Sequence, residues 1–145
     1  MIAIAADGVF DGEQYSGGGV MVVVDGERIV SVGPAGTAPP GGELIRFDGC
    51  TVLPGLIDAH VHLCCNGELG ALPGAVIGLV DGGVSLTAAL STATLHAATA
   101  LSLPGKGRLS PGSDADLLVV LGNPANDIIA LRTPQAVYLR GIRAH

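Results

Sequence analysis

The N-terminal third of the chain alternates between short apolar runs and turn-forming residues. Asp-Gly pairs follow three of these runs, at Asp7, Asp25 and Asp48, and the glycine of each pair supplies the positive φ that tight hairpin turns need. A loop is expected at 33–42, because its prolines cannot donate to a strand ladder. The pattern predicts a set of β-hairpins, with strands at 2–6, 19–24, 28–32 and 43–47.

The pattern changes at Cys50. A nearly continuous apolar run extends from there to Leu63, broken by Pro54 and Gly55, and such runs are typical of strands buried on both faces. A short helix is predicted over 72–80. A longer one is predicted over 86–103, because Ser85 is a suitable N-cap, alanine and leucine fill the interior and Pro104 follows. Its apolar residues fall on one face, which indicates a packing helix.

The C-terminal part returns to strand patterns. It predicts an apolar strand at 116–121, a turn of helix or an irregular segment at 124–131, and a closing hairpin at 136–142. We expect these strands to join the N-terminal hairpins. The predicted fold is therefore mixed and mainly β: a small composite β-sandwich or open barrel built from both chain ends, with one or two packed α-helices.

Composition excludes several kinds of partner. The 145 residues are 48% hydrophobic and 14% charged, which is typical of a folded chain with a real core rather than of a disordered segment. The net charge of −6 repels phosphate backbones and anionic lipid, and no basic patch is evident. We therefore expect no nucleic-acid partner and no membrane partner.

The cysteines and the N-terminus favour a reducing compartment. Cys50, Cys64 and Cys65 are an odd set without the spacing of a zinc ribbon or a disulfide framework. The first ten residues lack the features of a signal peptide, and no apolar run approaches the ~20 residues of a membrane span. Cytoplasmic localisation is the expectation.

A histidine pair is the main candidate for chemistry. His60 and His62 are two positions apart on the apolar run, so on a strand both imidazoles point to one side, about 6–7 Å apart at Cα, and can converge on a divalent cation such as zinc. Zinc needs at least a third protein ligand, and Asp58 and Cys64 are too far along an extended strand unless the chain bends. A metal site and a vestigial, partly solvated histidine pair are both open interpretations.

Other polar residues have a functional and a structural interpretation each. Asp58 would support a metal-bound histidine or serve as a turn carboxylate, and Cys64 and Cys65 would be nucleophiles or inert thiols. His96 is expected to be a packed or surface residue of the long helix, and the terminal His145 is expected to be disordered. The three glycines at 17–19 do not open a helix after a strand, so they predict a turn rather than a phosphate cradle.

Two segments resemble a known family. The sequence PGLIDAHVH at 54–62, and PGKGRLSPGSDADLLVV at 104–120, resemble the entrance and closing segments of the metal-dependent amidohydrolase superfamily, which includes dihydroorotases, imidazolonepropionases and cytosine deaminases. The resemblance implies that His60 and His62 end the first strand of a (β/α)8 barrel and supply the first two metal ligands. It also implies that both chain ends build one β-sandwich.

The chain is too short for that barrel. A (β/α)8 barrel needs roughly 250 residues, so no complete TIM barrel fits, and the family's later metal ligands and catalytic aspartate have no matching positions. We therefore interpret the chain as one composite domain over 1–145. Strands come from 1–53 and 104–145, a remnant of the first barrel strand and its junction from 54–83, and the packing helix from 84–103.

Two functions follow from this interpretation. The favoured one is a barrel-deleted amidohydrolase-like protein without hydrolytic turnover of its own, whose exposed strand is covered in a homo-oligomer or swapped dimer. The alternative is a metal-dependent hydrolase of C–N bonds in small-molecule amides, with His60 and His62 as ligands and the site completed by another subunit. No catalytic residue is assigned.

Overall fold

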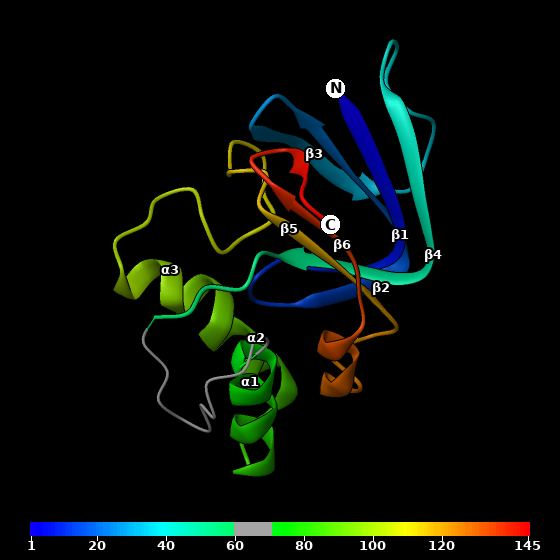
Figure 1. Cartoon of the computed structure of the whole chain (residues 1–145). Helices are drawn as coiled ribbons and strands as arrows, with labels where there is room; N and C mark the ends of the chain where they lie inside the picture. Colours follow the sequence, from blue (N-terminus) through cyan, green and yellow to red (C-terminus); the bar gives the residue numbers. More distant parts are fainter. Residues whose placement is uncertain (60–70) are drawn as a thin grey trace.

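The computed structural model describes residues 1–59 and 71–145, and the side chains from residue 74 onward in the second range. Its described strands form a single sheet in the order β3-β2-β1-β4-β5-β6-β7 (Figure 1). The strands are β1 (Ile2–Phe10), β2 (Tyr15–Asp25), β3 (Arg28–Pro34), β4 (Glu43–Pro54), β5 (Leu117–Leu121), β6 (Pro134–Leu139) and β7 (Ile142–Arg143). The mainly β fold predicted from the sequence is confirmed.

The two ends of the chain meet at the centre of this sheet. β1 pairs with β4 in parallel, and the second half of β4 pairs with β5 in antiparallel register, from Cys50 opposite Leu121 to Pro54 opposite Leu117. The predicted joining of the C-terminal strands to the N-terminal ones is therefore confirmed, and no closed (β/α)8 barrel occurs within the described ranges.

The sheet curls until its β3 edge meets the segment that precedes β5. The backbone N–H of Ile29 donates to the carbonyl of Ser113 at 2.9 Å, and the N–H of Ala115 donates to the carbonyl of Glu27 at 2.8 Å. Arg28 and Asp114 form an antiparallel bridge between these segments. The result is the open-barrel form of the composite sheet that the sequence predicts.

Two of the predicted turns are wrong. Asp7 lies within β1, and Asp48 and Gly49 lie within β4. The register of β1 against β4 shifts between Ala6 and Gly8 of β1. An Asp7 carboxylate oxygen accepts the Gly49 N–H at 3.0 Å, so the two Asp-Gly pairs form facing irregularities rather than hairpin turns. The prediction is correct at Asp25, which pairs with Arg28 across a tight turn.

The predicted glycine turn at 17–19 is also part of a strand. Gly18 and Gly19 lie in β2 with φ of 94° and 85°, a backbone conformation that favours glycine, at the level of the irregularity in β1. Three adjacent strands are thus irregular at the same level. Because bulges bend strands and increase their twist, this arrangement favours the curling of the sheet.

Helices cover one part of the outer face. They are α1 (Ala71–Asp81), α2 (Leu86–Ser91), the π-helical η1 (Thr92–His96), α3 (Ala97–Ala100) and the 3-10 helix η2 (Ile128–Arg132). Ser85 caps α2 as predicted, because its hydroxyl accepts the Ala88 N–H at 3.3 Å. The predicted helix over 86–103 is instead interrupted by η1 and ends at Ala100. None of the described helices is long and apolar enough to cross a membrane.

The apolar side chains form two cores on opposite faces of the sheet. The inner core lies inside the curl and takes side chains from β1 through β6, while the outer core lies between the sheet and the helices. β5 belongs to both, since Leu117 and Val119 face inward and Leu118 and Val120 face outward. This arrangement confirms that the strand formed by the run from Cys50 is buried on both faces as far as Pro54.

Candidate functional site

The predicted metal ligands cannot be placed. His60, His62, Cys64 and Cys65 lie outside the described residues, so the histidine pair stays a prediction. Within 1–59 and 71–145, no three histidine, cysteine, aspartate or glutamate side chains are grouped so that they could hold a metal ion. The described residues by themselves therefore form no metal site.

The other predicted candidates are dispersed. Asp58 is exposed just beyond the end of β4, and His96 is exposed at the end of η1. His145 is ordered, contrary to expectation, since its carbonyl accepts the Arg143 Nε–H at 2.9 Å and the Val137 N–H at 3.1 Å. These residues form no common site.

The chain leaves β4 through a junction held by backbone hydrogen bonds. The N–H of Gly55 donates to the carbonyl of Asp116 at 2.9 Å, and the N–H of Ile57 donates to the carbonyl of Ala93 at 2.8 Å. The first bond ties the junction to the start of β5, and the second ties it to η1. The backbone that leads toward Asp58 is thus fixed to both the sheet and the helices.

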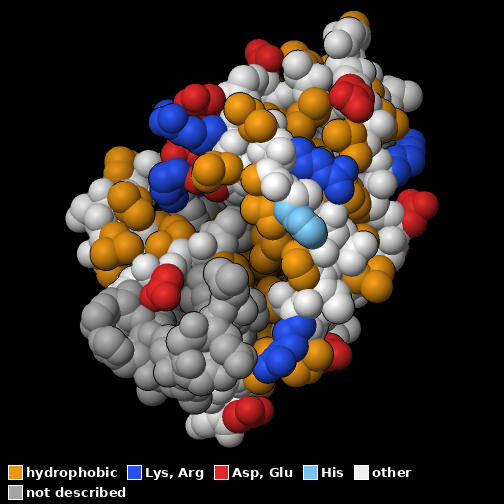
Figure 2. Space-filling view, in the orientation of Figure 1, with side chains coloured by type: hydrophobic (Ala, Val, Ile, Leu, Met, Phe, Trp, Pro, Cys, Tyr) orange, Lys and Arg blue, Asp and Glu red, His pale blue; other side chains and the backbone are white. Residues whose placement is uncertain are grey.

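An apolar cleft of about 440 Å³ opens beside this junction. Its floor is formed by outward-facing side chains of β5 and β6, and Figure 2 shows a hydrophobic hollow on this face of the molecule. The lining residues include Leu56, Ile57, Leu118, Val137, Leu139 and, at one side, Lys106 and Asp116. Its volume and apolar lining are typical of a site that binds a small molecule or a partner's side chains.

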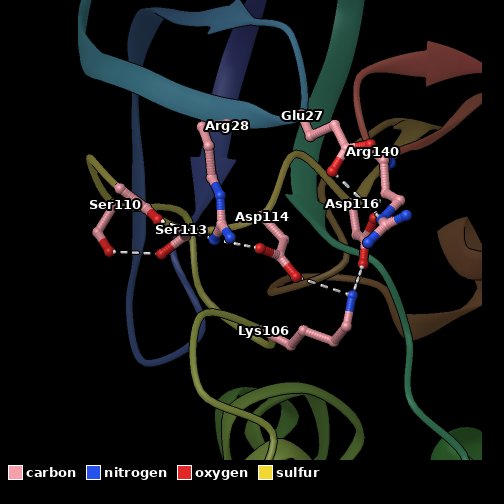
Figure 3. Close-up of polar contacts among 9 residues, drawn as sticks. Glu27, Arg28, Lys106, Ser110, Ser113, Asp114, Asp116 and Arg140 are labelled. Atoms are coloured by element: carbon pink, nitrogen blue, oxygen red, sulfur yellow. Dashed lines mark hydrogen bonds and ion pairs between the residues drawn. The ribbon is translucent and has the colours of Figure 1, made fainter.

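A cluster of charged side chains holds the wall of the cleft (Figure 3). The Lys106 ammonium donates to an Asp116 carboxylate oxygen and lies 3.0 Å from an Asp114 carboxylate oxygen. The Arg28 guanidinium contacts the other oxygen of Asp114, and the second oxygen of Asp116 accepts the backbone N–H of Arg140 at 2.8 Å. The cluster therefore joins β3, the loop at 105–107, the segment before β5 and the turn between β6 and β7.

The cluster shifts the pKa values of two of its members. The hydrogen bond with Asp116 raises the pKa of Lys106; burial opposes this rise, and Asp114 reinforces it. Burial alone would raise the pKa of Asp114, but the hydrogen bond from Lys106 and the charges of Lys106 and Arg28 hold it below its ordinary value. Both groups are thus kept charged, which stabilises the closed cluster.

Sequence reasoning did not find this cluster as a unit. The segment from Gly105 to Gly112, with Lys106 and Arg108, indicates tight turns, and the family resemblance implies a structural role for it, which agrees with the observed contacts of Lys106. The signal was the spacing of Asp114 and Asp116, two positions apart before an apolar strand, which places both carboxylates on one side. Arg28 is 86 positions from Asp114, so local pattern could not indicate it.

The surroundings of Cys50 make its thiol unreactive. It is buried in the inner core, and burial, followed by the charges of Asp7 and Asp48, raises the pKa of its thiol. A raised pKa leaves little thiolate at neutral pH, so Cys50 is a packing residue rather than a nucleophile.

Comparison with known proteins places the chain in a family. The model of the amidohydrolase family matches residues 65–142, more than half of the chain, and this chain belongs to that family. The resemblance found in the sequence is therefore confirmed. Members of this family typically bind a divalent metal.

The relatives are much longer than the matched segments. The chain is 44% identical over 50 residues to the imidazolonepropionase of Micrococcus luteus, a match that covers 34% of this chain and 12% of the relative. It is 43% identical over 42 residues to the dihydroorotase of Pelobacter propionicus, covering 29% of this chain and 10% of the relative. The matched segments thus span about a tenth of these curated relatives.

Solved structures give partial matches of the same kind. A Xaa-Pro dipeptidase with bound methionine matches with a TM-score of 0.49 and 28% identity, over 50% of this chain and 18% of that one. A molinate hydrolase matches with a TM-score of 0.48 and 25% identity, over 50% of this chain and 16% of that one.

Proposed function

We propose that this chain is a non-catalytic member of the amidohydrolase family, a composite β-sheet module that functions by association rather than by turnover. The observation that carries the proposal is the direct pairing of β4 with β5, which joins the two chain ends, with no barrel formed by the described residues between them. Strands from both ends also share the inner core. A chain that completes its own core in this way has a stable fold to present to a partner.

We propose a second copy of the chain as that partner. The apolar cleft and the exposed side chains of Leu139 and Ile142, 57% and 74% exposed, form apolar surface on β5, β6 and β7. Contiguous apolar surface of this kind favours association, and a homo-oligomer or swapped dimer would cover it. The proposed compartment is the cytoplasm, on the cysteine usage described above.

The competing function is a metal-dependent hydrolase of C–N bonds, with a site completed by another subunit. Family membership and the sequence pattern of His60 and His62 favour it. In that function the two histidines would supply ligands for zinc, and further groups would come from the partner chain. The two functions differ in whether the purified protein holds metal.

Metal analysis separates the two functions. The protein is purified without chelator, and its zinc content and hydrolysis of cyclic amides are compared with those of the His60→Ala, His62→Ala double variant; a His96→Ala variant is the matched control. We expect less than about one zinc per ten chains in all three proteins and no hydrolysis. Roughly stoichiometric zinc that is lost only in the double variant would overturn the non-catalytic proposal.

Light scattering tests the association. We expect a mass of at least two chains at micromolar concentration, reduced toward one chain by Leu139→Asp or Ile142→Asp, whereas Ile129→Asp, at an exposed position of η2 that does not line the cleft, leaves it unchanged. A monomeric mass for the unmodified chain would contradict the proposed partner. Whether the chain is catalytic would then be decided by its zinc content and its hydrolysis of cyclic amides.

A further inference from the structure

Within the described residues, a backbone hydrogen bond joins the helical segment over 86–100 to the junction that follows β4, and it is made at η1. The carbonyl of Ala93, in the first turn of η1, accepts the N–H of Ile57 at 2.8 Å. In a π-helical turn the backbone hydrogen bonds join residue i to residue i+5 rather than to residue i+4. A carbonyl at such a turn can lose its usual donor inside the helix and accept a hydrogen bond from outside it. The bond from Ile57 is such an external bond.

The same turn is approached closely by a loop from the other side. Gly107 has a φ of 74°, and a Cβ built on it would lie 2.5 Å from the carbonyl oxygen of Thr94 and 2.8 Å from the Cβ of Ala98. No side chain fits between these backbones, so the contact requires glycine. Its neighbour Lys106 is held by Asp114 and Asp116, which ties this contact to the charged cluster.

Threonines give a local reason for the π-helical turn. The hydroxyls of Thr92 and Thr94 each donate to the carbonyl four residues earlier, on Ala88 and Leu90, both at 2.8 Å. Such bonds compete with the helical ladder and often bend helices, and β-branched residues lower the preference for the α-helix. The sequence at η1 is therefore suited to a departure from α-helical geometry.

We propose that η1 is a backbone lock that fixes the path of the chain as it leaves β4. On one side the Ala93 carbonyl accepts the N–H of Ile57, the residue immediately before Asp58. On the other side Gly107 packs against the carbonyl of Thr94 and the side chain of Ala98, which follows in α3. Both held segments line the apolar cleft, because Ile57 and Gly107 are among its lining residues. The lock thus joins the helices, the exit of β4 and the wall of the cleft into one unit, and it holds whether or not the chain is catalytic.

Amide hydrogen exchange of Ile57 tests the lock, with Gly107→Ala as the disrupting variant. Gly112→Ala is the matched control, since Gly112 also has a positive φ, of 88°, but no atom lies within 4 Å of its added Cβ. We expect Ile57 exchange in Gly107→Ala to be at least about tenfold faster than in the unmodified chain, and in Gly112→Ala to change by less than about threefold.

The unmodified chain supplies a measurement that does not depend on the variant folding. We expect its Ile57 N–H to be protected to within about tenfold of the N–H of Ala89, which donates to the carbonyl of the N-cap residue Ser85 in the first turn of α2. An Ile57 N–H that exchanges as fast as an exposed amide in the unmodified chain would overturn the proposal. So would a folded Gly107→Ala variant in which Ile57 keeps its protection.

Discussion

The two faces of the sheet differ in how completely the chain covers them. The inner face is closed by the chain itself, because strands from both ends curl around one core in which Ile4, Val52 and Val119 are fully buried. Among the described residues, helices cover one part of the outer face, and beside them Leu139 lies exposed at the apolar cleft, with the exposed Ile142 opposite it on β7. The inner core is thus closed by the strands themselves, while apolar side chains remain exposed on the outer face.

The two faces of the sheet share strands. β4 and β5 place alternate residues in the inner and outer cores. A shift of either strand's backbone therefore changes the packing of both cores. A partner on the outer face would therefore be in contact with the strands that hold the two chain ends together.

Truncation of one leucine on each face gives the largest expected contrast. Leu117→Ala removes a fully buried side chain from the inner core and is expected to lower the free energy of unfolding by about 2–5 kcal/mol. Leu139→Ala removes a side chain at the cleft and is expected to cost about 0.5 kcal/mol or less in the dissociated chain. Urea denaturation of dilute samples measures both, and equal losses would show that the two faces are equally covered.

Disruption of the charged cluster is expected to have an intermediate effect. Asp114→Asn removes the charge that pairs with Lys106 and Arg28, and is expected to lower the free energy of unfolding by about 1–3 kcal/mol at neutral pH. Asp25→Asn is the control, since the carboxylate of the exposed Asp25 lies outside the cluster and forms an ion pair with the N-terminal amine at 3.8 Å. An unchanged stability in Asp114→Asn would show that the cluster does not hold the cleft wall.

The pH dependence of stability sharpens this test. The folded pKa of Asp114 is lowered from 3.8, so its contribution is fully present above pH 3.8 and is lost as the pH falls through the folded pKa. The folded pKa of Lys106 is raised from 10.5, so its contribution is present below pH 10.5 and is lost as the pH rises through the folded pKa. Thermal unfolding across the acid range should show a weaker acid-induced loss in Asp114→Asn than in the unmodified chain.

The smallest perturbation leaves the sequence unchanged. Because Cys50 is buried in the inner core with a raised pKa, its alkylation by iodoacetamide at pH 8 is expected to be roughly a hundredfold or more slower in the folded chain than in urea. Peptide mapping by mass spectrometry separates Cys50 from Cys64 and Cys65. Rapid alkylation of Cys50 in the folded chain would contradict the closure of the inner core.

Sequence pattern predicted what depends on local periodicity and on burial. The apolar run from Cys50 correctly indicated a strand buried on both faces, and Ser85 correctly marked the start of α2. The family resemblance correctly indicated that both chain ends share one sheet. The histidine pair at 60 and 62 stays a prediction.

The errors arose where distant segments decide the conformation. The Asp-Gly pairs at Asp7 and Asp48 are typical of turns, but the parallel pairing of β1 with β4 keeps both pairs within strands, where the Asp7 carboxylate accepts the Gly49 N–H. The π-helical turn at η1 was not predicted, since its external donor, Ile57, is 36 positions from Ala93. Such contacts follow from tertiary structure, which short-range pattern does not contain.

The position of β5 in the sheet has a consequence for how the chain folds during synthesis. Its partner β4 is complete by residue 54, whereas β5 begins only at residue 117, so the ribosome adds residues 55–116 before the second half of β4 acquires its antiparallel neighbour. Until then that strand has one open apolar edge, and closure of such a long loop is slow. The order of synthesis therefore places an unpaired apolar strand edge in the nascent chain, and such edges are prone to aggregation.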